Sequence, residues 1–361
     1  MRLPLEFRRT LTLLLDETSQ GRRRRLHRLP PSMRPLAEEL ADLMATPHPL
    51  FGLGAVHAKP RRAGRRLLRG VLSTNLPERL LPLLDPEHWV VILTTHNAVP
   101  MPRHPLADLY MADKAILRTS PRPGIPLSFR DFTSEDDFFP VAVEKTYDVF
   151  LNACFLPLKR AHLLLDAMIV SKRAGRPLSA LFVGYHWSAD SEGGTSHALE
   201  RSLREKIQEC SLDVVTPEPC WDLRSVNVWY NQSRLAVLPS STEAGPRVMA
   251  EAFLANVPYI GARDCRGGSI AYLSPLNGEA SPPEPRALAR CIWRALDRLD
   301  QYQPRRWALE HMCRRVALQR LRRCIREFGD RHSLAINLDV DATASLSWRW
   351  YHSALRAELE A

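Results

Sequence analysis

The pattern of apolar and polar residues becomes regular from residue 147 onward. Short apolar runs alternate there with longer segments whose apolar residues recur at helical spacing. Strands are predicted at Tyr147–Ala153, Leu178–Val183, Leu212–Val215, Arg234–Leu238 and Pro258–Gly261, and helices between them at Arg160–Arg173, His197–Gln208, Ser225–Gln232 and Arg247–Ala255. Strands that are apolar on both faces and alternate with helices predict an α/β fold, with a parallel sheet covered on both sides.

The pattern is weaker before residue 147. Helical spacing occurs at Leu3–Leu15 and Met33–Met44, so we expect a basic helical segment within residues 1–80. His88–Thr95 is a strongly predicted strand and Lys114–Thr119 a weaker one. Both belong to an N-terminal domain that we expect to span residues 1–146.

The C-terminal third reads as helical. Residues 284–328 are rich in Arg and have helical spacing, and Ser345–Leu359 predicts one more helix. We therefore expect an α/β domain at 147–335 and a separate helical segment at 336–361.

Composition adds a strongly uneven charge. The 361 residues include 50 basic and 40 acidic side chains, a net charge of +10. Residues 1–80 hold 16 basic and 7 acidic residues, so 16 − 7 = +9 of that excess lies there. The segment has few aromatic residues for stacking on bases, which disfavours nucleic acid. An anionic membrane surface suits it better. The alternative is that Arg is simply the surface cation of this chain.

Two further features set the expected environment. No apolar run approaches the roughly 18 residues that a membrane-spanning helix needs. The seven cysteines are scattered and form no C-x-x-C pair, which indicates free thiols in a reducing compartment. We therefore expect a cytoplasmic protein, peripheral to the inner face of the membrane if residues 1–80 contact lipid.

Polar residues follow several predicted strands, at the edge where parallel α/β sheets bind ligands. Lys159 and Arg160 come between a strand and a helix, and a cation pair at a helix N-terminus suits a diphosphate. The alternative is a solvated helix cap. Gly267 and Gly268 follow another strand, where their amides can bind an anion or simply form a turn.

A pair of carboxylates follows the strand that ends at Leu238. Glu243 precedes a predicted helix, and Glu251 lies within that helix, eight residues later. Ionised carboxylates accept hydrogen bonds, so sugar hydroxyls are natural partners. The alternatives are a partner of the helix dipole for Glu243 and a solvent-facing residue for Glu251.

Taken together, these loops resemble the C-terminal half of retaining GT-B glycosyltransferases of the "glycosyl transferases group 1", or family 4, type. The resemblance covers about residues 145–280. It depends on the ordered set Pro157-x-Lys159-Arg160, the Glu243/Glu251 pair after Leu238-Pro-Ser-Ser, Val257–Gly261, Gly267-Gly268 and Asn277-Gly278.

The resemblance implies two Rossmann-like domains with a cleft between them, the N-terminal one reduced or divergent. It implies transfer of a sugar from a nucleotide-sugar donor to a glycan or lipid-linked acceptor, with retention of configuration, in surface glycan synthesis. No metal and no cofactor besides the donor are expected. The implied catalytic residues are Glu243 and Lys159, and the implied donor-binding residues are Arg160, Gly184, Glu218, Gly245, Arg247, Glu251, Gly267 and Gly268. His186 and His96 are further candidates, and the final helix is expected to pack on the N-terminal domain.

Departures from the family pattern motivate a second hypothesis. Cys154 stands where the family usually has an Arg, and Pro246 offers no amide to a ligand. The N-terminal half shows no clear first strand with a glycine loop. The chain is therefore either a glycosyltransferase or a non-catalytic protein of the same fold that binds a partner.

Overall fold

The computed structural model describes residues 31, 34–35, 55–56, 58–60, 70–74, 89–94, 109–113, 117–118, 124–186, 195–217, 222–243, 245–331 and 336–338. Leu3–Leu15, Ser345–Leu359, Glu218, His96 and nearly all of Met33–Met44 lie outside these residues. Among the helices described, none combines the length and the hydropathy needed to cross a bilayer.

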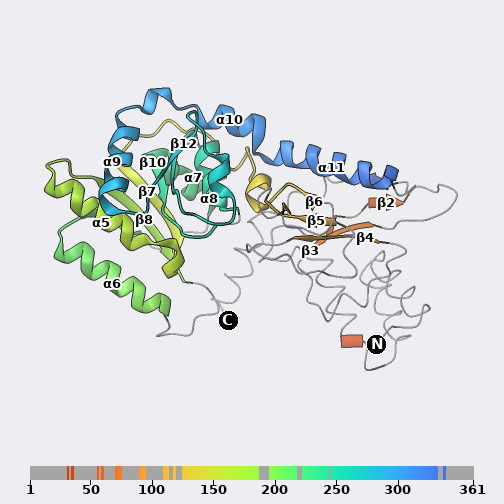
Figure 1. Cartoon of the computed structure of the whole chain (residues 1–361), viewed down its shortest axis with the longest axis horizontal. Coiled ribbons are helices and arrows are strands. Elements are labelled where there is room, and N and C mark those ends of the chain that lie inside the picture. The colour runs from red at the N-terminus through yellow and green to blue at the C-terminus, as the bar shows by residue number, and fades with distance from the viewer. Residues whose placement is uncertain are drawn as a thin grey trace.

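The predicted α/β domain forms a six-stranded sheet in which every neighbouring pair is parallel (Figure 1). Its order is β12-β11-β10-β7-β8-β9. The strands are β7 (Tyr147–Cys154), β8 (Ser179–Tyr185), β9 (Asp213–Val215), β10 (Ser233–Leu238), β11 (Tyr259–Ala262) and β12 (Gly278–Ser281). The predicted strands of this region are confirmed, and β12, which the sequence analysis did not predict, adds one edge.

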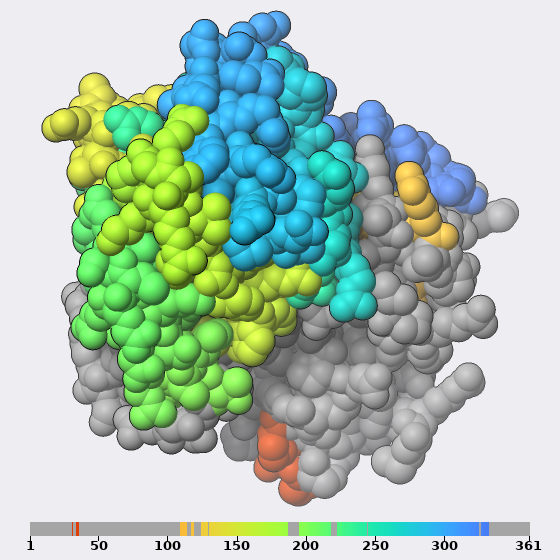
Figure 2. Space-filling view, turned by 60° about the vertical axis from the view of Figure 1, so that its left-hand side comes forward, coloured from red at the N-terminus to blue at the C-terminus, as the bar shows by residue number. Residues whose placement is uncertain are grey.

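Helices cover both faces of this sheet, as the alternating pattern predicts. Figure 2 shows α5 (Ala161–Arg173), α6 (Thr195–Glu209) and α9 (Pro285–Leu296) side by side on one face. The other face carries α7 (Leu223–Gln232), α8 (Arg247–Leu254) and α10 (Pro304–His311). Leu164, Leu165 and Met168 of α5 are buried in the core. Each such side chain contributes about 1.5–3 kcal/mol relative to an exposed one.

The order of the strands creates a switch point between β7 and β10. The chain builds outward from β7 to β8 and β9, then crosses back through α7 to place β10 on the other side of β7. The loops after β7 and β10 therefore leave the sheet in opposite directions and open a crevice. This crevice is where open α/β sheets bind ligands.

A second sheet precedes this domain, with the order β1-β3-β4-β5-β6. Its strands are β1 (Ala55–Val56), β3 (Gly70–Thr74), β4 (Trp89–Thr94), β5 (Leu109–Met111) and β6 (Gly124–Ile125), and β3 to β6 run parallel. β4 confirms the strand predicted at His88–Thr95.

Two predictions for the N-terminal part are wrong. The strand expected at Lys114–Thr119 is absent at its described residues, because Leu117 is helical and Arg118 lies in a turn. The actual strand is the short buried run Leu109–Met111, too brief to give a periodic signal. The helical expectation for residues 1–80 also fails at the described residues 55–56, 58–60 and 70–74, which form β1, β2 (Ala58–Pro60) and β3. These strands are short, and the Arg-rich stretch 61–69 separates β2 from β3 in the sequence, so their apolar residues give no periodic signal.

The C-terminal helices connect the two sheets. α11 (Arg314–Arg331) continues from α10 and runs along the side of the second sheet in Figure 1. It contacts η3 (Phe129–Phe132) and β13 (Ile336–Leu338), and β13 pairs antiparallel with β2. Strand β13 thus brings residues 336–338 back beside residues 58–60 of the N-terminal part.

Candidate functional site

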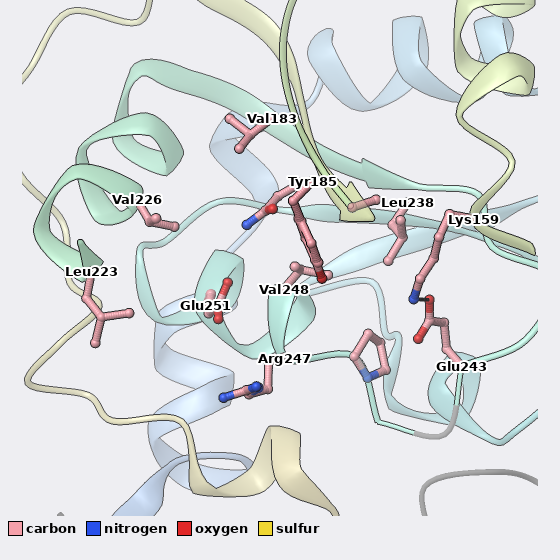
Figure 3. A pocket seen from close by; sticks show the side chains of 13 residues that line it. Lys159, Val183, Tyr185, Leu223, Val226, Leu238, Glu243, Arg247, Val248 and Glu251 are labelled. Carbon is pink, nitrogen blue, oxygen red and sulfur yellow. Dashed lines mark hydrogen bonds and ion pairs between the residues drawn. The ribbon is translucent and has the colours of Figure 1, made fainter. Parts of the chain in front are cut away.

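A pocket lies at the carboxyl edge of the six-stranded sheet, at the switch point. It encloses about 780 Å³, part of it open to solvent. The lining residues come from the ends of β7, β8 and β10 and from the starts of α7 and α8 (Figure 3). They are Asn152, Ala153, Lys159, Val183, Tyr185, Leu223, Val226, Leu238, Glu243, Pro246, Arg247, Val248 and Glu251.

Lys159 reaches the pocket from the turn after β7. It ends the short 3-10 helix η4 (Pro157–Lys159), and its ammonium group forms an ion pair with the carboxylate of Glu243 (Figure 3). The Lys159 side chain is 18% exposed and that of Glu243 is 9% exposed, so solvent screens this pair weakly. The backbone N–H of Ser241 donates to the carbonyl of Leu158 at 2.8 Å, which joins the loops after β7 and β10.

Arg160 does not reach the pocket. Its backbone is left-handed, with φ of 52°, and its guanidinium donates two hydrogen bonds of 2.9 Å to the carboxylate of Asp264. This bidentate pair holds the pKa of Asp264 below its usual value. Arg160 therefore secures the loop after β11, and its assignment to donor binding stays a prediction that this arrangement does not favour.

The loop that carries Glu243 is held by backbone pairing with the loop after β11. Thr242 forms a parallel bridge with Arg266, and the N–H of Glu243 donates to the carbonyl of Arg266 at 2.7 Å. Gly267 and Gly268 have φ of 105° and 94°, a backbone region that residues with a Cβ rarely adopt. These glycines do not line the pocket, and neither does Gly245; they shape the loops that present Glu243.

Glu251 lies in the first turns of α8 and is 1% exposed, so the alternative of a solvent-facing residue is wrong. The hydroxyl of Tyr230 on α7 donates a hydrogen bond of 2.9 Å to its Oε2. Burial raises the pKa of Glu251 to about 7, against the opposing effects of the Arg247 guanidinium and the Tyr230 hydrogen bond. Its carboxylate and the Arg247 side chain both belong to the pocket wall (Figure 3).

The start of α8 adds a further positive feature. No side chain caps this helix, because Pro246 occupies the N-cap position. Amides of the first turn and the helix dipole favour an anion there. Together with Lys159 and Arg247, the start of α8 forms a cationic wall beside the carboxylates of Glu243 and Glu251. This combination can bind a molecule that carries both phosphates and hydroxyls.

Cys154 ends β7 and is buried outside this pocket. Burial raises the pKa of its thiol, so the side chain is neutral and does not replace the Arg expected from the resemblance. Arg247 is the Arg that the fold brings to the pocket.

Val183 and Tyr185 face the pocket. Gly184 and His186 lie on the other side of β8, because side chains alternate along a strand. A Cβ at Gly184 would approach the ring of Phe155 within 2.1 Å, so this glycine serves aromatic packing. The structure thus brings Lys159, Glu243, Arg247 and Glu251 together, and leaves Arg160 and the predicted glycines outside the pocket. Tyr230 was missed because helical periodicity assigns it to the core, and Tyr185 because it lies beyond the predicted strand Leu178–Val183.

No protein-family model and no curated protein sequence matches this chain. Solved structures share its fold at low identity. HepE from Anabaena in complex with UDP has a TM-score of 0.57 and 14% identity, over 72% of this chain and 79% of that one. A glycosyltransferase from Rickettsia africae has a TM-score of 0.56 and 13% identity, over 72% and 76%. Sucrose-phosphate synthase from Thermosynechococcus elongatus has 0.51 and 19%, over 66% and 68%.

These neighbours confirm the fold class predicted from the sequence. At such identities the likeness establishes the fold alone. The chain therefore has the GT-B-like α/β fold of these glycosyltransferases, with two mainly parallel sheets.

Proposed function

We propose that this protein is a glycosyltransferase that binds a nucleotide sugar at the β7/β10 switch point and transfers the sugar to an acceptor. The observation that carries the proposal is the convergence of Lys159, Glu243 and Glu251 on one pocket from separate loops. The HepE structures, which hold UDP and UDP-glucose, support a uridine nucleotide as the first candidate donor.

The cationic wall suits the leaving group of such a transfer. Negative charge grows on the nucleoside diphosphate as the glycosidic bond breaks, and fixed positive groups lower the barrier. Lys159, Arg247 and the uncapped start of α8 are the groups available here. Lys159 leaves its ion pair with Glu243, or shares it, when the diphosphate enters.

The two carboxylates have separate tasks. Glu251, held by Tyr230 at 2.9 Å, accepts hydrogen bonds from ribose hydroxyls through its other oxygen. Glu243 orients the transferred sugar, and retention of configuration follows from the family resemblance. The acceptor is a glycan or a lipid-linked glycan. Contact of residues 1–80 with an anionic membrane, on the cytoplasmic side, belongs to the same proposal.

Paired variants of neighbouring cations test this assignment. Lys159→Ala removes the phosphate partner, whereas Arg160→Ala removes a side chain that Asp264 already holds. Calorimetric titration with UDP should show an affinity loss of about tenfold or more for Lys159→Ala, since hydrogen bonds to charged groups are worth about 1.5–3 kcal/mol. Arg160→Ala should bind UDP within about threefold of the wild type.

GDP is titrated in parallel to identify the base. If neither nucleotide binds the wild type, or if both variants bind like the wild type, the proposed donor site is wrong.

A non-catalytic protein of the same fold is the second candidate. It is favoured by the neutral Cys154 at the position of a family Arg and by the pairing of Lys159 with Glu243. Such a protein binds UDP yet releases no sugar from UDP-sugars, with or without candidate acceptors. If the wild type turns over a UDP-sugar and Lys159→Ala abolishes this activity, the non-catalytic candidate is excluded.

A further inference from the structure

A second cavity opens at the same edge of the sheet, on the opposite face of β8. It encloses about 560 Å³ and has an apolar floor that includes Phe155, Phe182 and Leu203. His186 and Glu200 line its mouth. The proposed donor pocket is lined instead by Val183 and Tyr185, so strand β8 separates the two cavities.

Three ligand-type side chains meet beside this cavity. His186 follows the end of β8, whereas His197 and Glu200 are three residues apart on α6 and share a helix face. One atom from each of the three lies within 4.8 Å of the others. The side chains of His186 and Glu200 are 31% and 21% exposed, so an ion from solvent can reach them.

Neighbouring residues orient two of these three side chains. Nδ1 of His186 lies 2.9 Å from the hydroxyl of the buried Ser196, and its Nε2 lies 2.8 Å from Oε2 of Glu200. The other carboxylate oxygen of Glu200 accepts a hydrogen bond of 2.8 Å from Arg204. Metal-binding His and carboxylate side chains are typically oriented in this way, through the atom that does not bind the metal.

The contact between His186 and Glu200 places a proton where a metal ion can sit. When the hydroxyl of Ser196 donates to Nδ1 of His186, Nε2–H donates to Oε2 of Glu200 at 2.8 Å. A divalent ion can replace this proton and bind both atoms.

We propose that His186, His197 and Glu200 bind one divalent transition metal ion of the zinc class. Two imidazoles and one carboxylate are a ligand set that zinc accepts, with about 2.0–2.2 Å to each atom and a further position open to solvent. Tetrahedral ligands at that distance lie roughly 3.4 Å apart, within the 4.8 Å that spans the three atoms and wider than the 2.8 Å between His186 and Glu200, which separate as the ion enters.

Binding also requires a change at His197. The rings of His186 and His197 stack with centroids 3.8 Å apart and planes at 16°, so their lone pairs lie in nearly parallel planes. The His197 ring turns out of this stack to aim a nitrogen at the ion. The ion then links the end of β8 to α6, and no step of sugar transfer passes through it.

The test uses the full-length protein after treatment with EDTA. Zn²⁺ is titrated by calorimetry, and Co²⁺ is followed by its visible absorption, which reports nitrogen and oxygen ligands. One ion per chain is expected, with a rise in Tm on Zn²⁺ addition. His186→Ala, His197→Ala and Glu200→Gln should each weaken binding by at least tenfold, and Ser196→Ala by about tenfold through loss of orientation.

His162→Ala is the matched control, because His162 is an exposed histidine on the neighbouring helix α5. It should bind Zn²⁺ like the wild type. His197 is only partly buried, so His197→Ala keeps the test informative if another variant misfolds, which circular dichroism reveals. Absence of stoichiometric binding, or equal binding by His197→Ala and His162→Ala, overturns the proposal and leaves an ordinary hydrogen-bonded cluster. UDP affinity is unchanged in either case.

Discussion

Lys159 and Arg160 are adjacent in the chain, yet the fold gives them different partners. Lys159 pairs with Glu243 beside the pocket, and Arg160 pairs with Asp264 away from it. The pocket instead receives Arg247 from the start of α8. At the scale of single residues, cationic character was predictable, whereas the choice of partner was not.

The proposed contact of Glu251 with ribose predicts that UDP binding depends on pH. Burial raises its pKa to about 7, so the carboxylate is mostly ionised at pH 8 and mostly protonated at pH 6. If the ionised form binds ribose, UDP affinity should fall by about tenfold between pH 8 and pH 6, following the competent fraction. Calorimetric titration across this range measures it.

Glu251→Gln supplies the control for this pH series. In this variant, UDP affinity can still vary with pH through the titration of UDP itself, but not through the carboxyl group of residue 251. An identical pH profile for the variant and the wild type would show that Glu251 does not contact the nucleotide.

At the scale of elements, the end of β8 is shaped by close packing. Gly184 faces the ring of Phe155, with no room for a methyl group between them. Phe155 also packs edge-on against Phe182, with centroids 5.8 Å apart. Gly184, which the family resemblance assigns to the nucleotide pocket, is thus explained by the packing of two aromatic rings.

Gly184→Ala should therefore destabilise the protein by about 1–3 kcal/mol, the usual cost of overpacking a core. Phe155→Leu frees space beside the strand, so the double variant should lose less stability than the sum of the two single variants. Urea unfolding of the four proteins gives this coupling. If the losses of stability in the two single variants simply add in the double variant, the destabilisation by Gly184→Ala does not come from a clash with the Phe155 ring.

At the scale of the whole molecule, a buried charge cluster joins the second sheet to the proposed donor domain. Arg130 on η3 is fully buried and forms an ion pair with Asp113, which follows β5. Its guanidinium also lies 3.7 Å from the centre of the Tyr272 ring, from the segment after Gly268. Nε and Nη1 of Arg130 have no hydrogen-bond partner among the described residues.

This junction predicts a stability that depends on pH. Burial raises the pKa of Asp113 to about 6, and Arg130 opposes that rise, while Asp131 and Tyr272 also face the group. In Arg130→Met the pKa of Asp113 should rise further. A carboxyl group whose pKa is raised on folding stabilises below its unfolded value near 3.8 and loses this contribution as pH rises.

The free energy of unfolding of Arg130→Met should therefore fall more between pH 5 and pH 8 than that of the wild type, by about 1.4 kcal/mol per unit of added pKa shift, as urea unfolding measures. Asp113→Asn/Arg130→Met removes the titrating group and serves as the control. Parallel profiles for the single and double variants would contradict this role of Asp113.

The sequence by itself determined the parallel α/β architecture of residues 147–261, because apolar periodicity is local and strands of this type must be covered on both faces. It also indicated the chemistry near the strand ends, where Lys159 and Glu243 stand in strand-to-helix segments and Glu251 lies in the helix that follows. The short strands β5 and β12 gave too few residues for a periodic signal.

Tertiary structure alone decided which of these groups meet. Lys159 and Glu243 are 84 residues apart, and Arg160 and Asp264 are 104 apart. Such pairs depend on strand order, which places β10 beside β7 and β11 beside β10. The same long-range geometry buried Glu251 against Tyr230 and gathered His186 with His197 and Glu200, contacts that no local pattern contains.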